Sequence, residues 1–214
     1  MKRVITILWL LCAPCFAIDN PITTDELNTW LSFDKPTALT RTEKKSHDME
    51  QLGSLIYCSE YASETQTLWK YRIALYKGAT LFGERRATME KGIEKSIADL
   101  TALPENQEKI GIEILTRPDG RKAYVSLMGF GPGGVGYWAF STLPGGAYDL
   151  LVMSISDSEH GLPSDQRLLN PALPTASLST VFQKVEEKVI EDINNGSQQS
   201  VPAYVAQGAP SAEP

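Results

Sequence analysis

The spacing of apolar residues changes near position 108, and this change constrains the fold more than any other feature. Residues 110–115 read IGIEIL, in which isoleucine alternates with other residues. A period of two is typical of a strand with one buried face. Three further β-prone runs follow, at residues 123–130, 135–141 and 147–156. Neighbouring strands with short links predict an antiparallel meander of about four strands.

A glycine-rich stretch, GFGPGGVGYWAFSTLPGG, occupies residues 129–146. A loop that cradles phosphate lies between a strand and a helix, so that the helix N-terminus meets the anion. Here the aromatic, β-prone run YWAF follows instead, and no Gly-Lys-Ser/Thr ending is present. We therefore interpret the glycines as turns or bulges of a sheet.

Helical patterns flank these strands. Thr23 to Glu26 has the spacing of a capping box and predicts a short helix to about Phe33. A second box at residues 48–51 opens a longer helical region, whose apolar stripe runs to Leu100 with Arg86 as its one interruption. A final helix with a box at residues 180–183 is predicted to end at 195–196. The fold class is α+β, with helices covering one face of the meander.

The first seventeen residues, MKRVITILWLLCAPCFA, resemble a secretory signal peptide in their layout. A basic start precedes a short apolar run, and Ala17 offers a small residue at the cleavage point. We expect export to the periplasm or the extracellular medium, with a single α+β domain at residues 18–196. Residues 197–214 are rich in Ser, Gln, Ala and Pro, which predicts a disordered tail.

Cleavage after Ala17 would remove Lys2 and Arg3 and take the formal net charge from −6 to −8. This acidic balance, without a basic block, argues against nucleic acid or anionic lipid as a partner. No second apolar run approaches membrane length, so we expect no stable membrane insertion after cleavage. Cleavage would also leave Cys58 as the one cysteine. An oligomer linked through Cys58 would then require an exposed thiol.

Four aromatic residues on or beside the strands are candidates for binding a ligand or a partner protein: Tyr124, Tyr137, Trp138 and Tyr148. Exposed aromatic rings beside glycines form contact surfaces of this kind. The alternative is that these rings fill the core between sheet and helices.

The densest group of metal-ligand residue types lies just after the last strand: Asp157, Glu159, His160 and Asp165. Their oxygens would suit calcium, and His160 would permit zinc. The spacing matches no established calcium loop or zinc pair, so we expect no cofactor, with a divalent metal as the alternative. Cys58 as a nucleophile served by His160 lacks any surrounding motif, and a buried inert thiol is the simpler interpretation.

Three functions follow from these features. The favoured hypothesis is an exported, non-catalytic binding or accessory protein of the bacterial envelope, whose partner is another envelope protein or a small ligand. The second is a hydrolase or metal-dependent enzyme that uses the loop at residues 157–165. The third is a structural or assembly component that docks through the tail at residues 197–214.

Overall fold

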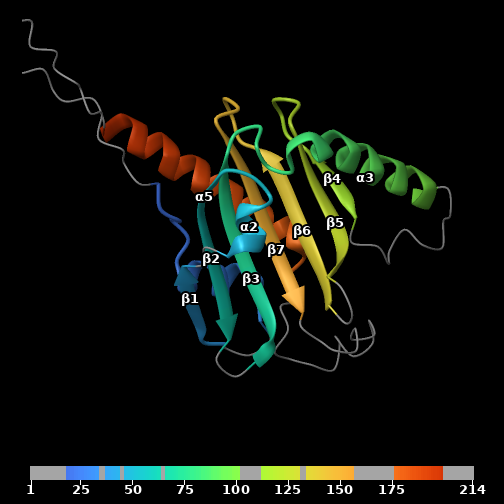
Figure 1. Ribbon diagram of the computed structural model, residues 1–214. Coiled ribbons are helices and arrows are strands. Elements are labelled where there is room, and N and C mark those ends of the chain that lie inside the picture. The colour runs from blue at the N-terminus through green and yellow to red at the C-terminus, as the bar shows by residue number, and fades with distance from the viewer. Residues whose placement is uncertain are drawn as a thin grey trace, which may run out of the picture.

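The computed structural model describes residues 18–33, 37–43, 46–63, 66–101, 112–130, 134–156 and 176–199 of the 214-residue chain (Figure 1). Its strands are β1 (Leu39–Glu43), β2 (Leu55–Ser63), β3 (Gln66–Lys77), β4 (Glu113–Thr116), β5 (Lys122–Phe130), β6 (Gly134–Thr142) and β7 (Tyr148–Ser156). Its helices are α1 (Thr24–Leu31), α2 (His47–Glu50), α3 (Arg86–Thr101) and α5 (Leu178–Gln199), with a 3-10 turn, η1 (Gly83–Arg85), before α3. The fold is α+β.

The seven strands form one antiparallel sheet in the order β1-β2-β3-β7-β6-β5-β4. The predicted meander is its β4–β7 half, in which each strand pairs with the next in sequence. A second meander, β1–β3, joins it through the pairing of β3 with β7 over residues 69–77 and 148–156. The sheet is therefore larger than the expected four strands.

The predicted helical region is wrong between residues 55 and 77, where the chain forms β2 and β3. Tyr71, Ile73 and Leu75 of β3 point into one core cluster, whereas Ala74 and Tyr76 point into another. A strand buried on both faces carries apolar side chains at successive positions. Apolar residues spaced three and four apart can be picked out of such a run, so the sequence pattern also fits a helix.

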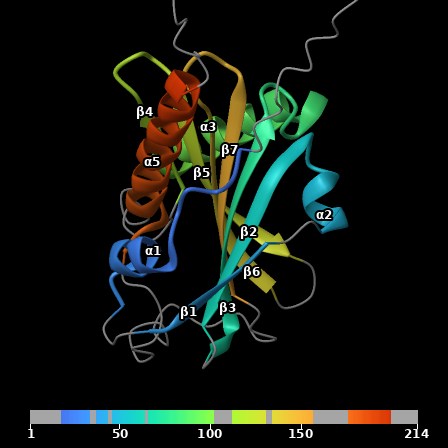
Figure 2. The same cartoon turned by 90° about the vertical axis from the view of Figure 1, so that its left-hand side faces the viewer.

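Helices lie on both faces of the sheet, which corrects the expectation that they cover one. On one face, α1 and α5 pack over β2, β3, β6 and β7 around Tyr61, Phe182 and Val185. On the other face, α2 and α3 enclose a cluster that includes Met49, Ile93 and the aromatic rings of β5 and β6. Figure 2 shows α1 and α5 on one side of the strands and α2 on the opposite side.

The strands on either side of residues 131–133 pair as a hairpin, which agrees with the interpretation of the stretch as sheet turns, and residues 131–133 themselves lie outside the described residues. Gly129 pairs with Val135 and Phe130 with Gly134, and β6 follows where a phosphate loop would need a helix. The turn between β6 and β7 places Gly145 and Gly146 at φ of +80° and +73°. Glycine adopts this left-handed region without steric penalty, so these residues permit the tight reversal.

The helix ends agree with the sequence in part. The capping box of α1 is confirmed: the amide of Glu26 donates to Thr23 Oγ1 at 3.2 Å, and Glu26 Oε2 accepts from the Thr23 amide at 3.0 Å. The boxes predicted at residues 48–51 and 180–183 are wrong, because α2 starts at His47 and α5 at Leu178. Helix α5 also continues through Gly196 to Gln199, since one glycine costs a helix only about 1 kcal/mol.

None of the helices that the structure describes is long and apolar enough to span a bilayer.

Candidate functional site

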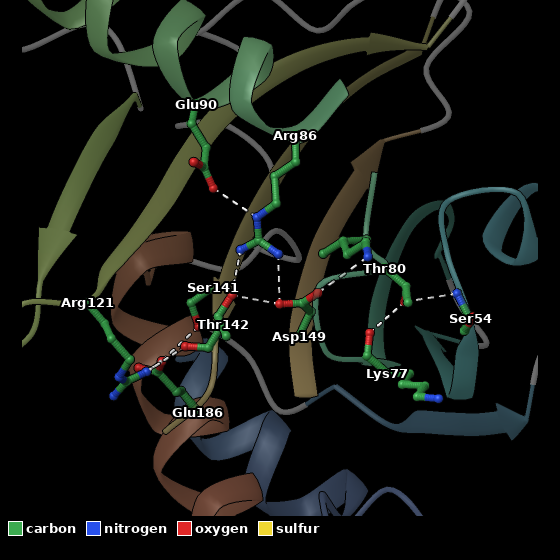
Figure 3. A network of polar contacts seen from close by, with 11 residues as sticks. Ser54, Lys77, Thr80, Arg86, Glu90, Arg121, Ser141, Thr142, Asp149 and Glu186 are labelled. Carbon is green, nitrogen blue, oxygen red and sulfur yellow. Dashed lines mark hydrogen bonds and ion pairs between the residues drawn. The ribbon is translucent and has the colours of Figure 1, made fainter. Parts of the chain in front are cut away.

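A buried carboxylate, Asp149, lies at the centre of the polar cluster drawn in Figure 3. Asp149 is the second residue of β7, opposite Thr142 of β6, and its side chain is 0% exposed. Its oxygens accept from Arg86 Nη1 at 2.7 Å, Thr142 Oγ1 at 2.7 Å and the Leu81 amide at 3.3 Å. Buried charge is costly unless paired and hydrogen-bonded, and these three donors meet that requirement.

Arg86 reaches Asp149 from the first residue of α3. Its Nε pairs with Glu90 Oε1 at 2.9 Å, one turn along the helix, and its Nη2 donates to Thr142 Oγ1 at 2.9 Å. The guanidinium also lies 5.6 Å from the centre of the Phe140 ring. Burial disfavours the charged guanidinium, but the hydrogen bonds to Glu90 and Asp149 outweigh it and raise the pKa of Arg86. Arg86 is thus a permanent cation that fixes the start of α3 to the sheet.

The loop before α3 has a strained backbone. Ala79 and Phe82 adopt φ of +60° and +65°, which are uncommon for residues other than glycine. The Phe82 ring packs edge-on against Trp138 and Phe140, with ring centroids 5.1 and 5.0 Å apart. Gly78 approaches the β6–β7 turn so closely that a Cβ there would lie 1.9 Å from a carbonyl oxygen of that turn. Aromatic packing therefore holds the strained loop against the sheet.

A second buried carboxylate, Glu186, lies on α5 at the opposite face. It is 4% exposed and accepts from Ser141 Oγ at 2.8 Å and Arg121 Nη1 at 3.4 Å, and it pairs with Arg117. Arg121 Nη1 also donates to the Thr142 carbonyl at 2.7 Å. Figure 3 shows that the Glu186 and Asp149 clusters meet at the end of β6, where Ser141 and Thr142 face opposite sides of the sheet.

These two clusters hold helices against the sheet. Each buried carboxylate faces three donors, and a nucleophile or general base must instead reach a substrate atom. The Arg86 cluster fixes α3 to one face and the Glu186 cluster fixes α5 to the other. Within the residues that the structure describes, no group of three or more His, Cys, Asp or Glu side chains is placed to hold a metal ion.

The four predicted aromatic residues divide between the two faces of the sheet. Tyr124 and Trp138 are each 6% exposed and belong to the cluster under α3. Tyr148 packs at the edge of the cluster under α5, and Tyr137 lies on that same face because it alternates with Trp138. Tyr148 lies opposite Leu143, just past the end of β6. Leu143 is six residues from Tyr137, which is roughly 20 Å along an extended strand. The four rings therefore do not gather into one patch.

The predicted metal ligands Asp157, Glu159, His160 and Asp165 lie outside the described residues, as do the leader at residues 1–17 and the chain from residue 200 onward. Cys58 lies in β2 and is 2% exposed. It is therefore part of a strand core and not of the predicted helix. The exposed thiol that a Cys58-linked oligomer requires is not present in this fold.

Sequence reasoning missed Arg86, Asp149 and Glu186 as the organising polar residues. A signal was available for Arg86, which was the one charge on an otherwise apolar helical stripe. Asp149 similarly interrupts the apolar run AYDLLVMSI, in which residues 149–153 are all buried. A charged residue at a core position predicts a buried ion pair, but the sequence does not name the partner.

The chain matches no protein-family model, no curated protein sequence and no solved structure.

Proposed function

We propose that this protein is an exported, non-catalytic binding or accessory protein of the bacterial envelope. The observation that carries the proposal is that Asp149 and Glu186 are buried and that each accepts from arginine and hydroxyl donors of the fold. These carboxylates stabilise the fold, and their burial keeps them out of reach of a substrate in this structure. Chemistry in the described part of the chain would have to begin from exposed side chains.

The export part of the proposal rests on residues 1–17. Their basic start, short apolar run and small residue at position 17 form the pattern that secretion machinery recognises and removes. The acidic balance of the remaining chain favours a protein or small-molecule partner over nucleic acid.

The aromatic residues that retain exposed surface are the candidates for partner contact. Tyr137 and Tyr148 are half-buried, so part of each ring faces solvent, whereas Tyr124 and Trp138 are core residues. Aromatic side chains supply much of the binding energy at protein interfaces. We assign Tyr137 and Tyr148 to contacts with an envelope protein, whose surface can span the roughly 20 Å between them, or one of them alone to contact with a small ligand.

The test begins with the protein in its own host. Fractionation and N-terminal sequencing should place it outside the cytoplasm with a start at Ile18. Chemical crosslinking in intact cells, followed by capture and reciprocal capture, should then identify one specific partner at several salt concentrations.

Substitutions of the two tyrosines test whether they contact the partner. Tyr137→Ser and Tyr148→Ser should weaken binding to the purified partner by about tenfold or more, on the scale of an interface aromatic. Asp149→Asn is the matched control, because it perturbs the core and leaves the surface unchanged. A protein that starts at Met1 in the cytosol would refute export. Absence of any reproducible partner or ligand would refute the binding role.

A further inference from the structure

Strand β1 forms one edge of the sheet. It pairs with β2 from Leu39↔Ser63 to Glu43↔Ser59, and among the described residues no strand lies along its other side. Residues 40–43 are exposed and Leu39 is half-buried. Figure 2 views the molecule from this side, and β1 crosses in front of β2. An exposed edge presents unpaired backbone N–H and C=O groups to another chain.

The sequence of this edge is complementary to itself. In an antiparallel pair of two copies centred on Thr42, Thr42 lies opposite Thr42, and Arg41 lies opposite the partner's Glu43. The two-fold symmetry repeats the Arg–Glu pair on the other side of the centre. Directly opposite residues lie about 5 Å apart on the same face, where opposite charges attract.

The side chains are positioned for this pairing. Glu43 Oε1 accepts from Arg41 Nη2 at 2.7 Å and from Ser59 Oγ at 2.9 Å, which holds the carboxylate along the face of the sheet. The Glu43 side chain is nevertheless 60% exposed. Arg41 is fixed by Nη1, which donates to the Ile22 carbonyl at 3.1 Å. Both charges are therefore ordered within one chain and remain accessible at its edge.

We propose that β1 is a self-association surface, through which two copies of this chain join antiparallel about Thr42 into one continuous sheet. Charged edge strands ordinarily prevent pairing because like charges meet. Here the order Arg-Thr-Glu brings unlike charges together in the two-fold register, so the charges select this partner and this register. In this register only Arg41, Thr42 and Glu43 of the two β1 strands lie opposite one another, three residues from each copy, so the dimer is weak, with a dissociation constant between roughly 10 µM and 1 mM.

The test uses the full chain, expressed with its leader, purified from the host and studied by sedimentation equilibrium up to about 1 mM at moderate salt. Arg41→Glu places Glu opposite Glu, and Glu43→Arg places Arg opposite Arg. Each single variant should raise the dissociation constant about tenfold or more, because two attractive pairs become repulsive. An equimolar mixture of the two variants should form a heterodimer with near wild-type affinity, since every opposite pair is again unlike.

The mixture of the two single variants distinguishes an effect on association from an effect on the folding of each chain. Within each single variant the Arg41–Glu43 contact of its own chain stays broken, so recovered association has to come from contacts between chains. Circular dichroism and thermal melting confirm that each variant is folded. The double variant Arg41→Glu with Glu43→Arg restores complementarity within and between chains, and it should dimerise even if a single variant fails to fold.

Three outcomes overturn the proposal. These are a wild-type protein that is monomeric throughout the concentration range, a dimer that is unaffected by both single variants, and a mixture of single variants that does not associate. A different occupant of the edge would appear as one of the first two outcomes.

Discussion

Replacing Arg86 with methionine should destabilise the protein more than replacing Asp149 with asparagine, although the two residues form one ion pair. Methionine keeps much of the side-chain length over Phe140 but removes the guanidinium. Asp149 then remains as a carboxylate that is 0% exposed, with only Thr142 Oγ1 and the Leu81 amide as donors. Breaking a buried pair in this way costs about 3–5 kcal/mol.

Asp149→Asn instead leaves Arg86 without its carboxylate partner, but Arg86 has other stabilising contacts. Arg86 keeps its pair with Glu90, and its side chain is 17% exposed. The asparagine oxygen can still accept one of the original hydrogen bonds. The loss should be about 1–2 kcal/mol, the scale of weakening a charged hydrogen bond. Since a typical domain is stable by about 5–15 kcal/mol, both variants should fold.

The assay is equilibrium unfolding in urea at neutral pH, followed by circular dichroism and by tryptophan fluorescence. Coincident transitions from the two probes would support a two-state treatment. The double variant Arg86→Met with Asp149→Asn completes a double-mutant cycle. We expect a coupling energy of about 1–3 kcal/mol, so that the double variant loses less free energy of unfolding than the two single variants together. If Asp149→Asn costs as much as Arg86→Met, or the two effects add, the asymmetry argued from burial is wrong.

Three further predictions concern the backbone, a helix cap and the thiol. Gly78→Ala should lower the free energy of unfolding by about 3 kcal/mol, because its Cβ would lie 1.9 Å from the Gly146 carbonyl oxygen. Gly92→Ala in α3 is the matched control: its Cβ meets nothing within 4 Å, so unfolding in urea should show a gain of about 0.5–1 kcal/mol, and a similar loss from both would contradict the close approach. The hydrogen bond from the Thr23 backbone lowers the pKa of Glu26 below its ordinary 4.5, so the stability that Glu26 contributes is present above that value and is lost as the pH falls through the lowered pKa. Glu26→Gln should therefore cost about 0.5–1 kcal/mol at pH 7 and less at pH 3, and a pH-independent cost would contradict the cap. Cys58 should react slowly with a thiol reagent in the native protein and quickly in urea, and fast reaction in the native state would refute its burial.

The sequence predicted the β4–β7 meander because each of its strands pairs with its neighbour in sequence through short turns. The turns at residues 117–120 and 143–146 carry glycines at positive φ, +82° at Gly120 and +80° at Gly145. The capping box at Thr23 was equally local, since both of its hydrogen bonds join residues three apart. Local chemistry was sufficient wherever the partners were close in sequence.

The prediction failed where the environment of a strand depended on distant segments. Tyr57, Cys58, Ala74 and Tyr76 are all buried, and they are buried because α1 and α5 cover one face of the sheet while α2 and α3 cover the other. A run that is apolar on both faces has no clean period, so periodicity alone assigned it to a helix. The same ambiguity hid β2 and β3, which join β1 to the rest of the sheet.

The chain by itself determined its glycine turns, its first helix cap, its α+β class and its acidic balance, because these depend on neighbouring residues or on composition. Tertiary structure alone decided that Arg86 meets Asp149 across 63 residues and that Arg121 meets Glu186 across 65. The partner of a buried charge is set by which strands pair and which helix packs above them. No local pattern specifies these choices, because they depend on burying the apolar surface of the whole sheet.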